Sequence, residues 1–332
     1  MIAFITGGTG FIGRKTVKKL LERNYEVIAL VRDLDRANSI HMPGVKLIKG
    51  NILERETMKA GMKDCDVVFH LAGWYKLGAR DQSNVYETNV VGTRNVLELA
   101  QELCVPRIIY TSSIGVYGDT NGLFHDENYQ RPLGRTFLTE YDRSKWQAHF
   151  QVAMPLITKG APITIVIPGA VYGPADRSLI GQLICAYLRG YLIAFPGPET
   201  MHTFAHVDDV AEGHILAYER GQAGQSYIIA GPGYPFWQIA RLWSILSGRP
   251  APKLLIPAKF IKPLEPIARF LSTHLPMPEL ISVDGIRLLG ATYIASSKKA
   301  ETELGWHART IEVGFKETLD WFQDFLTNSK EQ

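Results

Sequence analysis

The chain contains 332 residues, 46% of them hydrophobic, and its 36 Lys and Arg against 33 Asp and Glu leave a formal charge of +3. A chain of this size and composition is expected to be a globular protein of one or two domains, and so small a charge excludes the basic face of a typical nucleic-acid-binding protein. The three cysteines, Cys65, Cys104 and Cys185, form no CxxC pair, which favours a reducing compartment and offers no metal motif.

Short apolar runs alternate with helical stretches along the first half of the chain. The expected strands are 2–6, 25–31, 45–49, 66–72, 107–113 and 163–167, and the expected helices include 11–23 and 83–103. Strands this uniformly apolar belong to a parallel sheet that helices cover on both faces. The pattern therefore predicts an α/β fold with a doubly wound parallel sheet of the Rossmann type.

Proline and aromatic residues become frequent after Pro168, which is typical of a smaller, irregular lobe. A helix at 205–220 and the strand SYIIAG after it are expected to return to the main sheet. The predicted units are a dinucleotide-binding domain, 1–174 with 204–231 returning to it, and a discontinuous C-terminal substrate-binding lobe, 175–203 and 232–330. No apolar run is long enough to span a bilayer and no secretory signal precedes the first strand, so we expect a cytoplasmic protein.

A glycine-rich segment, TGGTGFIG (6–13), follows the first expected strand and opens the first helix. Gly7, Gly10 and Gly13 suit a tight turn, close approach of the backbone to a pyrophosphate, and close packing of helix on strand. The N–H groups of the helix N-terminus would then face the phosphates. This context predicts dinucleotide binding rather than an ordinary glycine turn.

The second expected strand ends in Arg32, where NAD-binding folds commonly carry an acid that binds the ribose 2′-hydroxyl. A guanidinium pairs better with a 2′-phosphate, and Arg36 could add a second cation, so NADP is favoured over NAD. Asp33 opposes this interpretation, and Arg32 could instead be a solvated loop charge.

Tyr141 and Lys145 in EYDRSKW (140–146) are four residues apart and therefore share one face of a helix. A close ammonium and the positive ring of an oxidised nicotinamide would lower the pKa of the phenol, which could then exchange a proton with a carbonyl or an alcohol. Ser112 and Ser113 follow the fifth strand, at the edge where parallel sheets carry their sites. The alternative is two unrelated polar residues on a solvent-facing helix.

Together these segments resemble those of the extended short-chain dehydrogenases, which include nucleotide-sugar epimerases, dihydroflavonol reductases and 3β-hydroxysteroid dehydrogenases. The resemblance is closest to dihydroflavonol-4-reductase-like proteins and runs almost end to end, through TGGTGFIG, VRD, GNI, HLAG, NVVGT, TSS with VYG, YDRSK, PGAVYGP, HVDDVAEGH and ELGW. It implies Ser113, Tyr141 and Lys145 as catalytic residues, with Lys145 also holding the nicotinamide ribose. The cofactor-binding residues that it implies are Gly7, Thr9, Gly10, Phe11, Ile12, Gly13, Arg32, Arg36, Asn51, Ile52, Leu71, Ala72, Gly73, Asn89, Tyr141, Lys145, Pro168, Ala170 and Val171.

Two departures from the family pattern bear on what the protein binds. Asn51 stands where relatives commonly carry Asp, which is expected to alter the affinity for adenine. His202 stands where nucleotide-sugar enzymes often have an arginine that contacts a substrate phosphate, and a downstream RxGD is missing. The pyrophosphate clamp of a nucleotide-sugar site is therefore not expected here.

Several other side chains are expected to be structural. Tyr117 is interpreted as a structural or pocket-wall aromatic, and His70 as a hydrogen-bonded core histidine. The three histidines of segment 202–214 follow no metal-ligand spacing. Trp74, Tyr75 and Lys76 could wall the substrate pocket or form a packed lid.

The sequence thus predicts an NADP-dependent oxidoreductase that transfers hydride between nicotinamide and a carbonyl or secondary alcohol of a mostly apolar small molecule. A nucleotide-sugar epimerase or dehydratase is the first alternative, and a non-catalytic NADP-binding sensor is the second, although such sensors usually lose the tyrosine or the lysine. The resemblance implies a homodimer through the helices of NVVGT and YDRSK. Segment 253–271 mixes basic and apolar residues as an interfacial helix does, but its three prolines favour packing within the lobe over membrane association.

Overall fold

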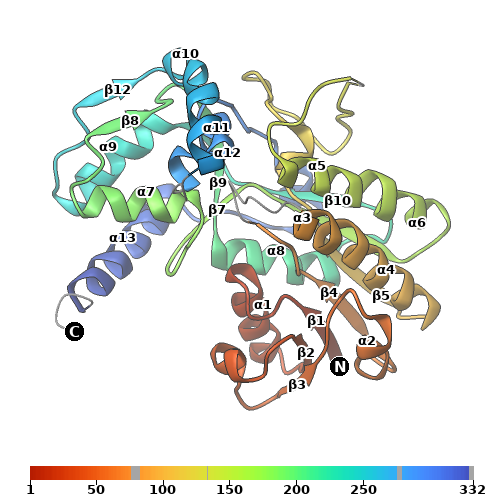
Figure 1. The fold of residues 1–332 in the computed structure, drawn as a ribbon. Helices are drawn as coiled ribbons and strands as arrows, with labels where there is room; N and C mark the ends of the chain where they lie inside the picture. The colour runs from red at the N-terminus through yellow and green to blue at the C-terminus, as the bar shows by residue number, and fades with distance from the viewer. Residues whose placement is uncertain (76–82, 133, 275–278, 329–332) are drawn as a thin grey trace.

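The structure, a computed structural model, describes residues 1–332 except 76–82, 133, 275–278 and 329–332 (Figure 1). Seven strands form the main sheet in the order β10-β6-β5-β4-β1-β2-β3, and all neighbours are parallel. Their bounds are β1 (Ile2–Thr6), β2 (Glu26–Val31), β3 (Val45–Lys49), β4 (Val67–His70), β5 (Arg107–Thr111), β6 (Ile163–Pro168) and β10 (Ser226–Ile229). The predicted doubly wound parallel sheet is confirmed, and SYIIAG joins its edge as expected.

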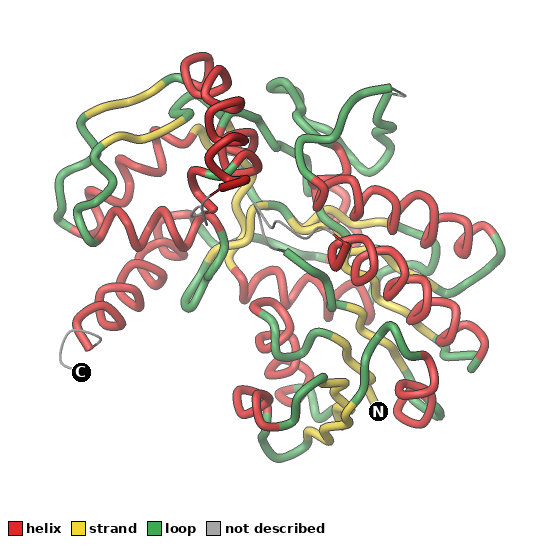
Figure 2. The backbone as a smooth tube through the Cα atoms, in the orientation of Figure 1, coloured by secondary structure: helices red, strands yellow, loops and turns green. Residues whose placement is uncertain are grey.

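Helices cover both faces of this sheet, as Figure 2 shows. Successive residues of a strand point to opposite faces, so Phe4 packs in one core, and Ala3 and Ile5 pack in another. The core around Ile5 contains α1 (Phe11–Glu22) and α8 (Val207–Glu219). The core around Phe4 contains residues of α2 (Arg55–Met62) and α4 (Thr93–Glu102). It also contains residues of one continuous helical run, which consists of α5 (Glu140–Trp146), the π-helical segment η4 (Gln147–Ala153) and α6 (Met154–Thr158).

Two small sheets and several helices lie beyond the main sheet. The sheets are β11-β9-β7 and β12-β8, with bounds β7 (Ala170–Tyr172), β8 (Ala194–Pro196), β9 (Met201–His206), β11 (Gly233–Pro235) and β12 (Leu254–Ile256). The helices are α7 (Leu179–Leu188), α9 (Phe236–Ser247), α10 (Ala258–Ile261), α11 (Glu265–His274), α12 (Val283–Leu289) and α13 (Ile311–Asn328). Trp243 and Phe315 are fully buried in the core that α7, α9 and α13 share. We call this part the second lobe; the predicted division into two domains stays a prediction.

Short helical turns connect several of these elements. They are α3 (Ser83–Tyr86), the π-helical η2 (Glu87–Gly92) and η7 (Ala300–Leu304), and the 3₁₀ turns η1 (Asp35–Ile40), η3 (Ile114–Tyr117), η5 (Lys262–Leu264) and η6 (Glu279–Ile281). Within the described part of the chain, no helix combines the length and the apolarity needed to cross a bilayer.

Candidate active site

One cavity joins the glycine loop, the TSS segment and the EYDRSKW helix. Its volume is about 450 Å³, and it is lined by Gly10 to Gly13, by Ser113 and Tyr141, and by side chains of the second lobe that include Phe236 and Tyr293. The main-sheet residues come from the carboxyl ends of β1 and β5, which is where parallel α/β sheets bind their ligands. The cavity therefore brings the glycine loop at 6–13 together with two motifs that lie about a hundred or more residues further along the chain, at 111–113 and 140–146.

The glycine loop at the entrance to α1 is shaped by close backbone packing. Gly7 has φ +74°, and a Cβ there would lie 2.5 Å from the backbone N of Ala72, while a Cβ at Gly13 would lie 2.0 Å from the carbonyl oxygen of Gly7. Only glycine fits at both positions. Gly10 caps α1 without a side-chain acceptor, and the first turn carries no acidic residue, so its N–H groups can serve an anion. These features fit the pyrophosphate of a dinucleotide.

The residues predicted to hold the adenosine part lie beside this loop but outside the cavity. Arg32 is exposed directly after β2, and Ile52 is buried. The side-chain oxygen of Asn51 accepts a hydrogen bond of 3.1 Å from the backbone N–H of Leu53, which fixes the turn after β3. The side chain of Arg36 and the residue Lys76 lie outside the described residues.

Ser113 and Tyr141 meet in the cavity. Ser113 follows β5 and caps η3, accepting a hydrogen bond of 3.1 Å from the N–H of Gly115. Tyr141 lies in the first turn of α5, which Thr139 caps by accepting from the N–H of Asp142 at 3.0 Å. Both side chains line the cavity, and Ser113 is close enough to Tyr141 to oppose the rise in its pKa. The two hydroxyls can therefore face one substrate oxygen.

Lys145 lies on the same helix and is 4% exposed. Its Nζ donates a hydrogen bond of 2.7 Å to the carbonyl oxygen of Thr111 at the end of β5. Burial lowers the pKa of the amine to about 7. Burial also raises the pKa of Tyr141 to about 12, although the nearby Ser113 opposes the rise. In the chain by itself desolvation is the largest influence on the phenol, and the predicted lowering, which also requires the oxidised nicotinamide, stays a prediction.

Asn89 fixes the wall behind this site. It lies in η2 and is 1% exposed. Its side-chain oxygen accepts from the N–H of Trp74 at 2.7 Å, and its Nδ2 donates to the carbonyl of Trp74 and to Ser144 Oγ at 3.1 and 2.9 Å. Asn89 thus ties the segment after β4 to the helix of Tyr141. The predicted position behind the site agrees with this geometry.

His70 is a core residue, as predicted. Its Nδ1 lies 2.7 Å from Thr6 Oγ1 and its Nε2 lies 2.9 Å from Thr93 Oγ1. Burial, together with the charge of Lys145, lowers its pKa to about 3, so the ring is neutral. Tyr117 is also buried, in edge contact with the rings of His125 and Tyr129.

The second lobe contributes acidic and apolar side chains that the sequence did not predict. Tyr293 donates a hydrogen bond of 3.0 Å to Asp142, and Asp176 and Glu279 also line the cavity. Burial raises the pKa of Asp142 to about 7 and that of Asp176 to about 6. Asp142 stands in the recognised YDRSK motif, so its position could have been inferred. The other three come from segments that no spacing rule connects to α5: Asp176 from the loop after β7, Glu279 from η6 and Tyr293 from an isolated bridge with His202.

The predicted site residues divide into two groups. Those that line the cavity are Gly10, Phe11, Ile12, Gly13, Gly73, Ser113, Tyr141, Ala170 and Val171. Those that lie outside its lining are Gly7, Thr9, Arg32, Asn51, Ile52, Leu71, Ala72, Asn89, Lys145 and Pro168. Gly7 and Lys145 in the second group support the lining from behind, through the packing and the hydrogen bond described above.

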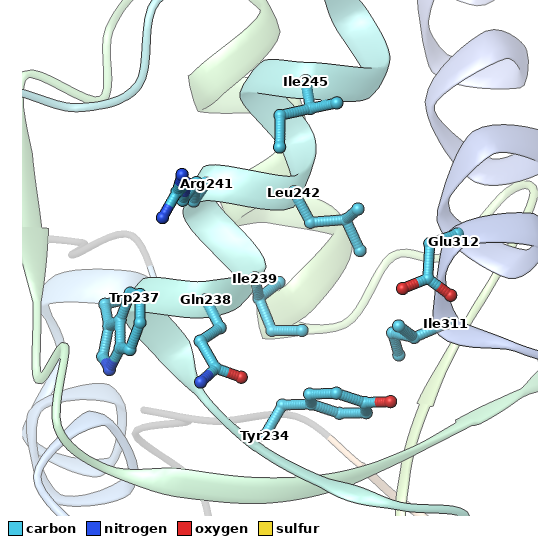
Figure 3. Close-up of a pocket in the computed structure, with 9 residues that line it drawn as sticks. All are labelled: Tyr234, Trp237, Gln238, Ile239, Arg241, Leu242, Ile245, Ile311 and Glu312. Carbon is cyan, nitrogen blue, oxygen red and sulfur yellow. The ribbon is translucent and has the colours of Figure 1, made fainter.

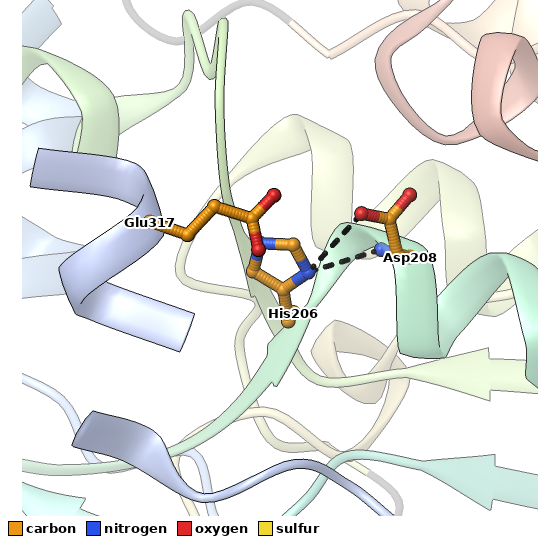
Figure 4. A group of neighbouring side chains, drawn as sticks. All are labelled: His206, Asp208 and Glu317. Carbon is orange, nitrogen blue, oxygen red and sulfur yellow. Dashed lines mark hydrogen bonds and ion pairs between the residues drawn. The ribbon is translucent and has the colours of Figure 1, made fainter. Parts of the chain in front are cut away.

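A group of possible metal ligands lies elsewhere, around His206 (Figure 4). The ring nitrogens of His206 lie 3.6 Å from Asp208 and 3.7 Å from Glu317. However, Lys15 pairs with Asp208 at 3.0 Å and Arg309 pairs with Glu317 at 2.8 Å. Because cations already neutralise both carboxylates, this group is an ion-pair network that ties α1 and α13 to β9 rather than a metal site.

A second hollow, of about 310 Å³, lies between α9 and the start of α13 (Figure 3). Tyr234, Trp237 and Ile245 line it, together with Arg241 and Glu312. None of the predicted site residues lines it, so the cavity around Tyr141 is the candidate active site.

Comparison with known proteins agrees with this geometry. Residues 3–230 match the model of the NAD dependent epimerase/dehydratase family. The chain belongs to this family. It is an enzyme of the extended short-chain dehydrogenase type, which confirms the resemblance inferred from the motifs.

Three similar proteins indicate the range of this family. A Synechocystis protein named "Putative dihydroflavonol 4-reductase" is 34% identical over 97% of this chain and 94% of its own length. Sterol demethylase protein B of Methylococcus capsulatus is 28% identical over 98% of this chain and 99% of its own. The dTDP-glucose 4,6-dehydratase DesIV of Streptomyces venezuelae, solved with NAD bound, has a TM-score of 0.78 at 23% identity over 98% of this chain and 97% of its own, a likeness of fold.

Proposed function

We propose that this enzyme transfers hydride between NADP and the carbonyl or secondary-alcohol carbon of a mostly apolar small molecule. The observation that carries the proposal is the single cavity shared by the N-terminus of α1, Ser113 and Tyr141. A bound nicotinamide cofactor supplies the hydride and, when oxidised, a positive charge. The anion-binding end of α1 and the proton-carrying hydroxyls are the two parts that such a reaction requires.

The resemblance to the family assigns a role to each of the three catalytic residues, and their surroundings support these roles. Tyr141 gives a proton to the substrate oxygen during reduction, or takes one during oxidation. Ser113 donates a hydrogen bond to the same oxygen as charge develops there. Lys145, whose Nζ donates to the carbonyl of Thr111, would hold the nicotinamide ribose. Because the chain by itself raises the pKa of Tyr141 to about 12, the lowering needed for proton exchange has to come with the cofactor.

The cofactor is NADP in this proposal because Arg32, directly after β2, is exposed and carries a guanidinium. The comparisons agree only on a nicotinamide cofactor, and DesIV was solved with NAD. The choice therefore depends on the charge at the second strand, which a substitution at Arg32 tests directly.

The electrostatics of the cavity favour a neutral, apolar substrate. Asp142, Asp176 and Glu279 line it, whereas Arg177, which is exposed, is the one basic side chain among the described lining residues. Burial lowers the pKa of His202 to about 4, so this ring is neutral where nucleotide-sugar enzymes often place an arginine. An anionic diphosphate would thus meet carboxyl groups without a buried counter-charge.

A nucleotide-sugar epimerase or dehydratase is the second candidate. It is favoured by the family description and by the DesIV fold, and opposed by the charges just described. A non-catalytic NADP sensor is the third, and the retained Ser113, Tyr141 and Lys145 oppose it.

A homodimer through η2 and α5 is part of the proposal, and analytical ultracentrifugation tests it.

The test is NADPH oxidation with matched substrates. We expect turnover of benzaldehyde or an aryl ketone. For 4-carboxybenzaldehyde we expect kcat/KM to be at least about ten-fold lower, because its carboxylate would meet the acidic lining of the cavity; a tenfold change corresponds to only about 1.4 kcal/mol. The matched variant Glu279→Gln should raise kcat/KM for the carboxylate substrate and leave NADPH binding unchanged. Conversion of a UDP- or dTDP-sugar without net NADPH oxidation would establish the second candidate, and NADPH binding without any turnover the third.

A further inference from the structure

A helical run at the edge of the second lobe exposes an apolar stripe. The run consists of α10, η5 and α11, which follow one another without a break (Figure 1). Phe260, Leu264 and Ile267 are 59%, 48% and 58% exposed, and their spacing of four and three residues places them on one side of the run. Ile261 and Ala268, on another side, are buried against α12. The segment thus packs within the lobe through one side and exposes the other.

The apolar side chains continue onto the neighbouring strand. Leu254 and Leu255 of β12 are 55% and 47% exposed. Only Pro257 separates β12 from α10, so the exposed apolar residues follow one another along the chain, and we call residues 253–270 the 253–270 surface. Soluble proteins rarely expose so many large apolar side chains in one stretch without a binding role.

The charge of the 253–270 surface is basic. Lys253, Lys259 and Lys262 are exposed, and within the described part of the chain no carboxylate pairs with them. Glu265, the acidic residue of this surface, is held by Arg269 at 2.6 Å and by Arg287 at 2.5 Å. Lysines around exposed aliphatic and aromatic side chains are the composition of a helix that lies in the plane of an anionic bilayer surface.

The 253–270 surface lies next to the active-site cavity. α11 packs on α12, whose Leu288 and Leu289 line the cavity, and Glu279 of the preceding turn η6 lines it as well. A molecule that dissolves in the bilayer would therefore approach the enzyme at the element that forms one wall of its site.

We propose that the 253–270 surface docks the enzyme peripherally onto anionic lipid bilayers, with Phe260, Leu264 and Ile267 inserted at the interface and the three lysines on the lipid headgroups. This proposal is independent of the redox chemistry. A second copy of the chain is a poorer occupant, because a two-fold dimer brings the same patch of both subunits together and would oppose lysines to lysines.

Vesicle flotation tests the proposal with the full-length protein. The probes are vesicles of phosphatidylcholine alone and of phosphatidylcholine with phosphatidylglycerol. We expect the wild-type protein to float with the anionic vesicles, to float less with the neutral ones, and to be released by salt. Each Lys→Gln change at 253, 259 or 262 should lower partitioning roughly five-fold, and Phe260→Ser with Ile267→Ser should lower it roughly a hundred-fold.

The matched control is Leu123→Ser with Val313→Ser, since these side chains are 65% and 58% exposed but lie outside the surface. Flotation should not change in this control. All four substitutions replace exposed side chains, and circular dichroism checks that the fold is retained. The proposal fails if the wild type floats with neither vesicle, if the serine variants at 260 and 267 float like the control, or if those variants instead turn a dimer into a monomer. Because flotation needs no turnover, its outcome and that of the NADPH assay are separate.

Discussion

Replacement of Lys145 by Met should stabilise the cofactor-free protein while it impairs the enzyme. The buried amine has its pKa lowered from 10.5 to about 7, which corresponds to a cost of about 5 kcal/mol for keeping the charge in the folded state. Methionine fills a similar volume without the charge, but it forfeits the hydrogen bond to the carbonyl of Thr111, worth about 1.5–3 kcal/mol for a charged donor. The net gain expected at pH 6 is about 2 kcal/mol, or about 3 °C in Tm for a chain of this size.

The pH dependence of this gain has a definite sign. The folded state binds the proton of Lys145 less tightly than the unfolded state, so wild-type stability rises between about pH 7 and pH 10.5, and the penalty is fully present below pH 7. Thermal melts of both proteins at pH 6 and pH 9.5 measure it, with Lys18→Met as the control because the Lys18 side chain is 70% exposed. The variant should melt higher at pH 6, and the difference should shrink or reverse at pH 9.5. A variant that melts lower at pH 6, or a difference that is the same at both values, would refute the reasoning.

Three further predictions concern Arg32, Asn89 and Asp142. Arg32→Glu should raise the KM for NADPH about ten-fold or more and leave the KM for NADH within a few-fold, because the guanidinium serves only a 2′-phosphate; equal changes for both cofactors would contradict the NADP assignment. Asn89→Leu should lower the free energy of unfolding by about 3 kcal/mol, since the buried Asn89 side chain makes three hydrogen bonds that leucine cannot make. A urea titration that shows no loss of stability would contradict the view that Asn89 holds the segment after β4 against α5. Burial raises the pKa of Asp142 from 3.8 to about 7, so the folded protein loses stability when this carboxyl ionises. The Tm of the wild type, measured against that of Asp142→Asn, should therefore be lower at pH 8 than at pH 4. A wild type that gains stability relative to the variant between these pH values would exclude this.

Much of the main sheet could be predicted because its strands are uniformly apolar and its loop glycines have strict backbone requirements. The expected strands 2–6 and 45–49 match β1 and β3, and the expected strand 66–72 ends earlier, at His70. Ser113 could be placed at the carboxyl edge of the sheet because it follows the fifth strand, and the resemblance to the family joined it with Tyr141 and Lys145.

The raised pKa of Tyr141 in the chain by itself could not be predicted, since it depends on how completely the fold buries the phenol. For a similar reason the sequence does not reveal Asp176, Glu279 and Tyr293 as neighbours of the site. Their side chains reach it from segments that lie up to about 150 residues beyond α5. The sequence suggested an interfacial helix at 253–271 but could not decide whether Phe260 and Ile267 are exposed, because an apolar stripe in a sequence does not say whether another element covers it.

Turnover of Tyr141→Phe is the most direct measurement of the proposed mechanism. NADPH oxidation with a neutral aryl aldehyde should fall about 10²- to 10⁴-fold in kcat, with NADPH binding retained, because phenylalanine keeps the ring and removes the proton donor. Tyr75→Phe is the matched control, since the Tyr75 ring contacts the Tyr141 ring at 4.9 Å and lines the same cavity, and it should stay within a few-fold of wild type. Wild-type turnover in Tyr141→Phe would show that the proton comes from another group and would contradict the account.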